Sequence, residues 1–569
     1  MYVRVTSTRN SPRQSVKVVE SIREGYKVKQ VMVLHVGIAA DEQEVEKLKM
    51  IGKEFILEEE LRRKNNSSQL SLLDPISAKE QIASIEKRIA QKKQGRKPTI
   101  TLQDVTREDR ISLSELVEEK RIVEGIHDVA GHVYDQFGYS ELLKRTKDQA
   151  LLKDLVLMRL AEPSSKLKAQ NMLDKRFART HDLDTIYRLM DKIYPKISLI
   201  KQKTFQRTQK ILPESVDILF FDCTTLYFES IETDELRAFG YSKDHRFNTT
   251  QVVLALATNS DGLPIGYELF EGNKAEVKTL LICLEEWKKL FSIKSVCFVA
   301  DRAMMSDENL SALEAQGHQY VVAAKLRSLP KSLQKELFLQ CNYKTEILNG
   351  GLGWVGEFEY KSRRVVVSYK TDRARKDAHQ RNQILDKLKK CLGETGNTKQ
   401  LITNKGVKKY TRSENSKTKI DPKKIAHDAA WDGLHGVITN IRDEEAHNVL
   451  ARYGRLWKIE ESFRINKHTL SMRPIYHFKP ERIKAHIALC FMAFSVLRHM
   501  EYQVKLTQKI GLEVMLDELM HVQASFYRHT PTHKLYRMPG KFSQSAAKIY
   551  KAFQLQRKNH AQVVCLIDK

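Results

Sequence analysis

The stretch DILFFDCTTLYF at residues 217–228 decides the fold. An apolar run of strand type leads into Asp222, and a second run, SVCFVAD at residues 295–301, ends on Asp301 in the same way. We expect each acid to lie at the carboxyl end of a central strand. Ligands and catalytic groups of open α/β sheets collect at such strand ends. The two runs therefore predict a central sheet whose strands present two acids.

The residues between the two runs follow a regular order. Thr250–Thr258 is rich in β-forming residues, the segment NSDG at 259–262 is a hairpin signal, and Leu263–Phe270 returns as a strand. Lys274–Phe291 predicts a helix, because its apolar residues recur at helical spacing. The predicted order is thus strand, strand, strand, helix, strand. Tyr320–Lys325 is a credible fifth strand.

A third acid comes from the stretch YGRLWKIEESFRINK at residues 453–467. Residues three, four and seven apart share one face of a helix, so Tyr453, Arg464 and Lys467 would share a side with Glu460. The carboxylate could then hold a metal ion, and the bases could hold phosphates. The alternative is an ordinary amphipathic helix with solvated charges, since i,i+4 charge pairs are common on surface helices.

This order of strands and acids resembles the ribonuclease H-like core of DDE transposases. Residues 453–467 resemble the Tyr-Arg-Glu-Lys signature of the insertion-sequence-four branch, and Tyr453, Glu460 and Lys467 match it. The Arg position of the signature is Leu456 in this chain, so either Arg455 or Arg464 would replace that phosphate contact. Residues 120–505 carry the resemblance, with further matching pieces at 240–246, 301–310 and 432–440.

The resemblance implies an α/β multidomain protein. Its ribonuclease H-like mixed-sheet catalytic core would be interrupted by a β-rich insertion, with mainly helical N-terminal and C-terminal accessory regions. Such an enzyme cleaves DNA at the terminal inverted repeats of an insertion sequence and joins the 3′-hydroxyl ends to target DNA, with a hairpin intermediate as one route. Asp222, Asp301 and Glu460 would be its catalytic acids and would hold two Mg²⁺ ions, which Mn²⁺ can replace.

The same resemblance assigns DNA contacts. Tyr453, Arg464 and Lys467, with Arg455 as the other candidate, would grip the terminal phosphates. Trp354 would stack on an extruded base near the element's end. The alternative for Trp354 is a core position, which is the commoner fate of a Trp beside strands.

Composition agrees with a nucleic-acid partner. The chain has 569 residues, 97 Lys plus Arg against 71 Asp plus Glu, and a formal net charge of +26, which favours polyanions. Basic composition can also serve solubility alone. We expect double-stranded DNA, both element ends and target, as the partner, a homodimer in a synaptic complex, and no membrane. The expected location is the cytoplasm of a prokaryote, on the nucleoid when DNA is bound.

At this length we expect two to four domains, from a norm of about 150 residues each. The predicted regions are an N-terminal part with strands, charged helices and a basic linker that binds DNA ends (1–110), a helical region (111–212), the catalytic core (213–330 and 445–505), a β-rich insertion (331–444) and a C-terminal helical region (506–569). The seven cysteines form no Cys-x-x-Cys pair, so neither a zinc ribbon nor a disulfide framework is indicated.

Two other functions remain open on this evidence. A stand-alone metal-dependent nuclease would use the same acids without joining strands. A non-catalytic DNA-binding regulator derived from a transposase would have lost an acid, whereas all three acids are present here.

Overall fold

The computed structural model describes residues 2–7, 14–24, 27–39, 99–104, 111–212, 218–240, 248–275, 278–291, 296–301, 306–348, 351–394, 409–414 and 417–567, with single positions 45, 48, 49 and 56. The chain forms two compact units. One comprises Met1–Thr99 with Ile567–Lys569, and the other comprises Ile100–Leu566. The second unit carries all the predicted catalytic acids.

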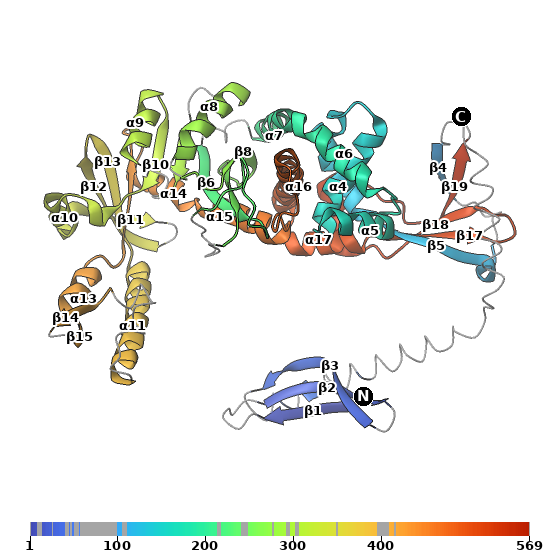
Figure 1. Ribbon diagram of the computed structural model, residues 1–569, viewed down its shortest axis with the longest axis horizontal. Coiled ribbons are helices and arrows are strands. Elements are labelled where there is room, and N and C mark those ends of the chain that lie inside the picture. Colours follow the sequence, from blue (N-terminus) through green and yellow to red (C-terminus); the bar gives the residue numbers. More distant parts are fainter. Residues whose placement is uncertain are drawn as a thin grey trace. The chain divides into compact units, whose positions relative to one another are not determined.

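The largest sheet of the described residues has nine strands, in the order β11-β12-β13-β16-β10-β9-β6-β7-β8 (Figure 1). Its centre consists of β6 (Ile218–Tyr227), β7 (Gln251–Thr258), β8 (Pro264–Glu271), β9 (Cys297–Ala300) and β10 (Gln319–Ala323). The first three are antiparallel neighbours, whereas β9 runs parallel to β6 and β10 parallel to β9. The predicted strands and their order are confirmed. The helix α8 (Thr279–Phe291) begins later than the predicted Lys274, because Lys274 still belongs to the turn that follows β8.

The two faces of the sheet are covered by different helices. On one face Leu219, Phe221 and Cys223 of β6 pack against α8 and α9 (Asp307–Ala315). On the other face Phe220 and Leu226 belong to the cluster that includes the later helices. This alternation follows from the two-residue period of a strand. Each fully buried large apolar side chain, such as Trp287 of α8, contributes about 2 kcal/mol through removal from water.

The strands predicted for the insertion continue this same sheet. They are β11 (Tyr343–Leu348), β12 (Gly351–Tyr360), β13 (Arg363–Tyr369) and β16 (Leu434–Thr439). β16 pairs antiparallel with both β10 and β13, so it joins the two halves. The helix α10 (Lys331–Leu337) precedes β11. The insertion's edge is thereby hydrogen-bonded to the central strands.

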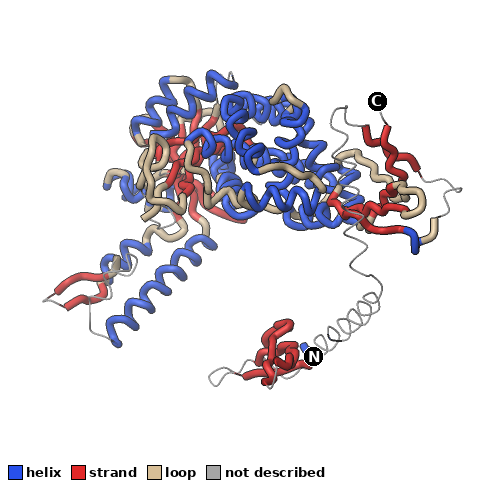
Figure 2. Tube along the Cα trace, turned by 45° about the vertical axis from the view of Figure 1, so that its right-hand side comes forward, coloured by secondary structure: helices blue, strands red, loops and turns tan. Residues whose placement is uncertain are grey.

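A small cluster projects from the insertion (Figure 2). It contains the helix α11 (Thr371–Glu394), as predicted, together with β14 (Thr411–Glu414), β15 (Lys417–Ile420) and α13 (Pro422–Ala429). Leu388 and Tyr410 form its buried centre. Asp421 caps α13 by accepting hydrogen bonds from the first-turn N–H groups of Lys423 and Lys424, which explains where that helix begins.

The region predicted to be helical at 111–212 is helical apart from one strand. Its helices are α3 (Gly131–Gln136), α4 (Thr146–Ala161), α5 (Lys166–Phe177), α6 (Leu183–Ile193) and α7 (Ile197–Ile211). Residues 162–165, which include Pro163, separate α4 from α5. The prediction is wrong at β5 (Leu116–Val123), which pairs with a strand some 400 residues later. Such distant pairing overrides the helical preference of its Glu, Lys and Arg residues.

The prediction of a mainly helical C-terminal region is also wrong. Beside α17 (Leu512–His521) and α18 (Gln544–Ala552) it contains β17 (Gln523–His529), β18 (Leu535–Pro539) and β19 (Gln562–Ile567). These strands form a sheet in the order β4-β19-β18-β17-β5, where β4 is Thr99–Asp104. α17 ends at His521, and β17 begins two residues later.

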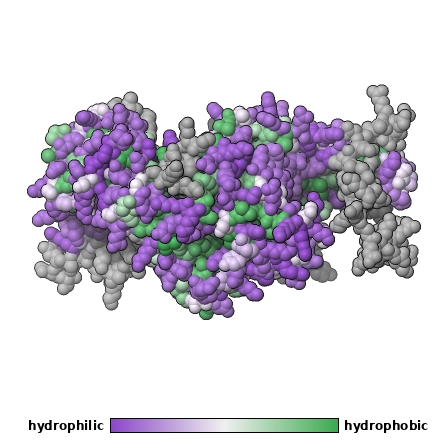
Figure 3. Space-filling model, turned by 90° about the horizontal axis from the view of Figure 1, so that it is seen from above, coloured by the Kyte–Doolittle hydropathy of each residue, from purple (hydrophilic) through white to green (hydrophobic). Residues whose placement is uncertain are grey.

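The longest described helix is α16 (Pro480–Thr507), 28 residues that run through the core. By length and composition alone it could cross a membrane. However, 94% of its most apolar window is buried inside the protein, so its apolar residues are those of a core helix. The face of the molecule seen in Figure 3 is mostly hydrophilic.

The N-terminal unit holds an antiparallel sheet of β1 (Tyr2–Ser7), β2 (Gln14–Glu24) and β3 (Lys27–Ala39). This confirms the strands predicted there. Val16, Ala39 and Val45 form its buried centre. The helices predicted at 41–64 and 76–90 lie outside the described residues, apart from the single positions named above, and so does the basic run at 87–98.

Candidate active site

Asp222 and Asp301 come at matching points of two neighbouring parallel strands. β6 and β9 pair with Phe221 opposite Ala300, and the next residue along the chain is in each case one of the two acids. Asp301 directly follows β9, as predicted, whereas the prediction that Asp222 ends its strand is wrong, because β6 continues to Tyr227 in its pairing with β7. Adjacent strands lie about 4.8 Å apart. Phe220 and Val299 face the same helix-covered side, and by the two-residue period Asp222 and Asp301 face it too. Two carboxylates therefore share one face of the sheet.

The third acid lies on a helix that packs over this face. Glu460 belongs to α15 (Trp457–Arg464), whose buried residues Ile459 and Phe463 join the same core cluster as Phe220. α15 contacts β6 and β7. Glu460 itself is exposed. Within the described residues, no three His, Cys, Asp or Glu side chains are close enough together to hold a metal ion, so the structure does not bring the carboxylate of Glu460 to the two Asp residues.

The single helix predicted for residues 453–467 is wrong. Tyr453 is the penultimate residue of α14 (Ala446–Gly454), α15 begins at Trp457, and the backbone continues as a π-helical turn at Ile465–Thr469. The one-face argument from Glu460 to Tyr453 therefore fails. Gly454, a poor helix residue, marks the break. Tyr453 nevertheless lies at the site, because it lines the same pockets as Asp301 and Glu460.

Two adjoining pockets connect the acids. One, of about 700 Å³, is lined by Asp301, and the other, of about 420 Å³, is lined by Glu460. His435, Tyr453 and Arg373 line both of them. The pockets together form a trench, which we call the acid cleft, that leads from Asp301 past His435 and Tyr453 to Glu460.

The predicted DNA-contacting bases lie along this helix and its ends. Arg455 is exposed at the break between α14 and α15. Arg464 is exposed on α15 and forms an ion pair with Glu461 at 3.6 Å. Lys467 is half-buried in the π-helical turn. All three flank the segment that carries Glu460, and Arg455 and Arg464 have room to meet a polyanion.

Trp354 lies on β12 at some distance in sequence from the acids. Its ring is 5.5 Å from that of Tyr369, and the side chain is half-buried. It lines a separate pocket of about 340 Å³ together with other aromatic residues, Phe338 and Tyr343. Asp432 and Leu434 line both this pocket and the Asp301 side of the acid cleft. Trp354 is thus neither fully core nor part of the acid cluster.

His435 is a residue of the site that the sequence patterns did not indicate. His435 lies on β16, and its ring is 5.0 Å from that of Tyr453. Burial, together with the nearby charge of Arg373, lowers the pKa of His435 to about 4, although Asp301 opposes this shift. Arg373 of α11 and Lys370 also line the cleft. The available signal was the matching piece at 432–440, which contains His435, but its place beside Asp301 depends on strand pairing.

The outer wall of the cleft is made of cations that already have acidic partners. Arg381 donates two hydrogen bonds to Asp432, Nη1 to Oδ1 at 2.5 Å and Nη2 to Oδ2 at 2.6 Å. Asp428 accepts hydrogen bonds from Arg327, Tyr410 and Lys409, the last at 2.7 Å. These hydrogen bonds hold the pKa of Asp428 well below its usual range, although burial opposes them. We call these five charged residues the paired wall.

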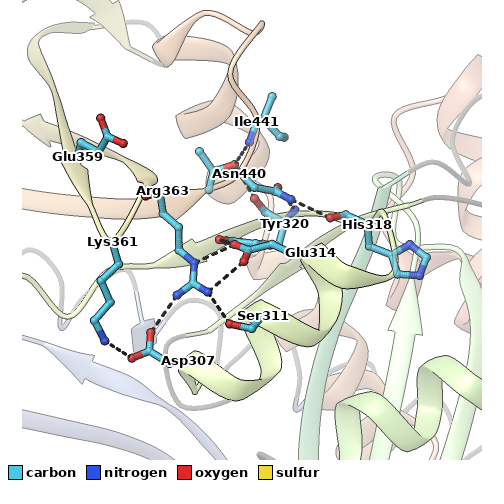
Figure 4. Close-up of polar contacts among 12 residues, drawn as sticks. Asp307, Ser311, Glu314, His318, Tyr320, Glu359, Lys361, Arg363, Asn440 and Ile441 are labelled. Atoms are coloured by element: carbon cyan, nitrogen blue, oxygen red, sulfur yellow. Dashed lines mark hydrogen bonds and ion pairs between the residues drawn. The ribbon is translucent and has the colours of Figure 1, made fainter.

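A further network fixes α9, which begins at Asp307, a few residues after Asp301 in the sequence (Figure 4). Arg363 of β13 donates to Glu314 at 2.8 Å, to Asp307 at 2.9 Å and to Ser311 at 3.0 Å, all on α9. Its hydrogen bond holds the pKa of Glu314 below the usual range. Asn440 bridges β10 and its preceding turn by accepting from Tyr320 N and donating to His318 O. The insertion thus fixes α9 and the start of β10, the elements that follow Asp301 in the chain.

Comparison with known proteins gives one family match. Residues 215–496 match the family model described as the transposase DDE domain. The cryo-EM structure of the piggyBac transposase synaptic complex with hairpin DNA is similar at a TM-score of 0.35 and 10% identity, covering 74% of this chain and 82% of that one. The Mos1 transposase paired-end complex with the left transposon end has a TM-score of 0.14 and 12% identity over 32% of this chain and 58% of that one.

At these TM-scores the two structures indicate neither the fold nor the function of this chain. No curated protein matches the sequence. The family match alone therefore bears on this chain: its residues 215–496 are similar to the transposase DDE domain.

Proposed function

We propose that the chain is a DNA transposase, which cuts the phosphodiester bonds at the terminal inverted repeats of an insertion sequence and joins the freed 3′-hydroxyl ends to target DNA. The family match at residues 215–496 supports the transposase class. The single observation that carries the chemistry is the register of β6 and β9, which brings Asp222 and Asp301 to neighbouring positions beneath the helix of Glu460. The strand order 8-7-6-9-10 supports a ribonuclease H-like core.

The donor set of the site suits a hard divalent cation. Two carboxylates on one face of adjacent strands are oxygen ligands of the kind that Mg²⁺ or Mn²⁺ prefers. We assign Asp222 and Asp301 as shared ligands and Glu460 as the ligand that completes the second site. Bound in a pair, such ions would act as Lewis acids on the attacking and leaving oxygens. Glu460 is exposed beside the cleft, so its side chain can take up such a role without unpacking α15.

The reaction needs no redox partner. Water adds its oxygen to the phosphorus at the element's end, the bond to the 3′-oxygen breaks, and that oxygen leaves as a 3′-hydroxyl. The 3′-hydroxyl then attacks a target phosphate, whose own 3′-oxygen departs. The proposed roles of this chain are to grip the phosphates with Tyr453, Lys467 and one of Arg455 or Arg464, and to orient the strand in the cleft.

Several parts of the proposal concern assembly. The pocket of Trp354, lined by further aromatic rings, supports stacking on an extruded base next to the cleft. We propose that residues 1–110 recognise the element ends and that a homodimer brings two ends together on double-stranded DNA. The proposed location is the prokaryotic cytoplasm, at the nucleoid. A hairpin intermediate remains one route between cleavage and joining.

The test is incubation of the full chain with a labelled DNA fragment that carries the flanks of its own gene, plus a plasmid target, with Mg²⁺, with Mn²⁺ or with EDTA. The variants are Asp301→Asn and, as a matched control, Asp372→Asn, an acid whose side chain is 96% exposed at the start of α11. We expect metal-dependent cuts at matched inverted repeats and joined products, both absent only in Asp301→Asn. Metal-dependent cuts at random positions would instead establish a nuclease, and binding without any cut a regulator.

A further inference from the structure

A further pocket, of about 220 Å³, lies outside the acid cleft between the end of α4, the start of α5, α16 and the loop after the π-helical turn. We call it the basic pocket. Its lining residues are Arg159, Pro163, Ser164, Ser165, Lys166, Ser471, Arg473, Pro474, Tyr476, His477 and His486. None of these is acidic. A cavity lined by several bases and no acid is electrically unbalanced.

Two of the bases are almost completely buried. Arg159 and Lys166 are each 6% exposed. In the part of the chain that the structure describes, neither has a carboxylate oxygen within 4.0 Å, since the nearby Glu162 pairs with Lys168 and Arg176 instead. Buried charges are normally paired, because removing a lone ion from water costs several kcal/mol. These two cations therefore lack the partner that burial demands.

The hydrogen bonds of Arg159 and Lys166 do not use all of their N–H donors. Arg159 donates Nη1 to the carbonyl oxygens of Leu470 at 3.4 Å and Ser471 at 3.3 Å. The Nζ of Lys166 is 3.3 Å from Nδ1 of His486, whose Nε2 is 3.1 Å from the carbonyl oxygen of Met472. That geometry suits a neutral His486 that donates through Nε2 and accepts from Lys166. Lys166 then keeps further N–H groups for a ligand.

Other observations point to an anion. The buried Oγ of Ser164 has no hydrogen-bond partner among the described residues. The pocket opens at the N-terminus of α5, a 12-residue helix whose dipole adds partial positive charge there. Burial and the charge of Arg159 lower the pKa of Lys166 to about 7, and burial lowers the pKa of His477 to about 3. The lowered pKa values reflect the free-energy cost of holding a positive charge in this pocket. A bound anion would offset that cost.

We propose that the basic pocket binds a phosphate group of the DNA backbone, at a site distinct from the acid cleft. This assignment to DNA rests on the proposed function. Its volume suits one phosphate with part of a sugar. The loop that forms it begins four residues after Lys467, and the guanidinium of Arg473 stacks 5.0 Å over the ring of Tyr227 at the end of β6, the strand of Asp222. A strand held in the cleft can continue to this pocket.

The exposed ring at its rim agrees with a nucleic-acid ligand. Tyr476 lines the pocket and is 58% exposed, so it offers a stacking surface for a base next to the bound phosphate. A pocket evolved for a free inorganic anion has no need of such a ring.

The first arm of the test uses no DNA. The melting temperature of the full chain is measured in chloride and in increasing inorganic phosphate at constant ionic strength, for the wild type, Lys166→Met and the control Lys168→Met. Lys168 lies on the same helix, but its side chain is 56% exposed and paired with Glu162. We expect the melting temperature of the wild type and of Lys168→Met to rise with the logarithm of phosphate concentration, and that of Lys166→Met to stay constant. A flat response of the wild type would overturn the proposal.

The second arm measures binding to a 40-base-pair duplex across a range of salt concentrations. Lys166→Met should weaken binding about tenfold and reduce the salt slope by about 1, whereas Lys168→Met should change neither. If phosphate stabilises the wild type but Lys166→Met binds DNA like the wild type, the pocket takes a free anion and the DNA assignment is overturned. If the wild type responds to phosphate but binds no duplex at all, the proposed function fails together with that assignment, while the anion site stands.

Discussion

Two clusters of cations in this molecule differ in whether carboxylates neutralise their positive charge. In the paired wall, Arg327, Arg381 and Lys409 meet Asp428 and Asp432 at hydrogen-bond distance. In the basic pocket, Arg159 and Lys166 are more deeply buried, yet no described carboxylate lies within 4.0 Å of either. The first cluster is complete without a ligand and holds α11 and α13 together. The second is complete only when an anion enters.

This contrast shows how the role of a basic residue can be inferred in a chain of net charge +26. Charge alone does not separate bases that hold the fold from bases that await a phosphate. Pairing does, because a paired cation has to lose its carboxylate before it can bind a phosphate. Arg464 on α15 lies between these extremes, since it has a carboxylate partner at 3.6 Å and is still largely exposed.

The largest effect is expected from removing an acid of the cleft itself. Glu460→Gln should lower DNA cleavage by roughly a thousandfold, about 4 kcal/mol of transition-state stabilisation, because the proposed metal site loses a charged ligand. Binding of DNA should stay within about twofold, since no phosphate contact is lost. Cleavage and binding are measured side by side, with the exposed Glu513→Gln as control. Equal losses of cleavage and binding would remove Glu460 from the chemistry.

Removing one partner of an ion pair in the paired wall should lower the free energy of unfolding. Arg381→Met leaves Asp432 buried without its partner, so the free energy of unfolding in urea should fall by about 3 kcal/mol. The double variant Arg381→Met with Asp432→Asn should recover most of that loss. Lys166→Met, in contrast, should leave stability in phosphate-free buffer unchanged or raised. A large loss in Lys166→Met would contradict the difference between the two clusters.

The pH dependence of stability sharpens the comparison further. Lys166 has a pKa of about 7 in the folded chain against the ordinary 10.5, so between these values the unfolded chain binds more protons. The free energy of unfolding should therefore rise with pH in this window, by about 2 kcal/mol from pH 7 to pH 9 relative to Lys166→Met. The charged and titratable groups around Lys166 are Arg159, Arg473, His477, His486 and Cys490. Chemical unfolding at pH 7 and pH 9 checks this, and parallel changes in both proteins would contradict it.

Lys467→Ala should weaken binding to cut element ends about tenfold, through the loss of one charged hydrogen bond to a phosphate. The footprint should change at the end and stay the same in the interior of the repeat. An unchanged footprint at the end would show that Lys467 serves the fold of the π-helical turn instead.

The smallest expected effect separates Arg455 from Arg464. Both are exposed near Glu460, so each single Ala variant should change affinity by no more than about threefold. The variant that also lowers cleavage identifies the residue that replaces the signature Arg absent at Leu456. Cleavage by the two variants at saturating DNA is the measurement, and equal rates would mean that neither replaces it.

The central strands could be predicted because their signals are local. The run before Asp222, the NSDG turn and the helical spacing before Phe291 each act within a few residues. The pairing of β5 with β17 could not be predicted in this way, since it joins residues about 400 apart. The same holds for the insertion strands, whose attachment to β10 through β16 depends on tertiary pairing.

The candidate site was predictable to a similar degree. The run patterns located Asp222 and Asp301, and the sheet register adds that the two are neighbours. The helix rule failed for Tyr453 because Gly454 ends α14 before Glu460 is reached. His435 and Arg373 come to the cleft from a distant strand and helix, so no local spacing could place them beside Asp301.

The most direct test of the central claim, that Asp222 and Asp301 form one metal site with Glu460, is the binding of Mn²⁺ followed by its electron paramagnetic resonance signal. The full chain, with a short duplex, is compared with Asp222→Asn, Asp301→Asn and Glu460→Gln at equal concentrations. We expect the wild type to bind Mn²⁺ and so to lower its free concentration. Each Asp variant should lose this binding, and Glu460→Gln should lose part of it. Binding unchanged in both Asp variants would contradict the account.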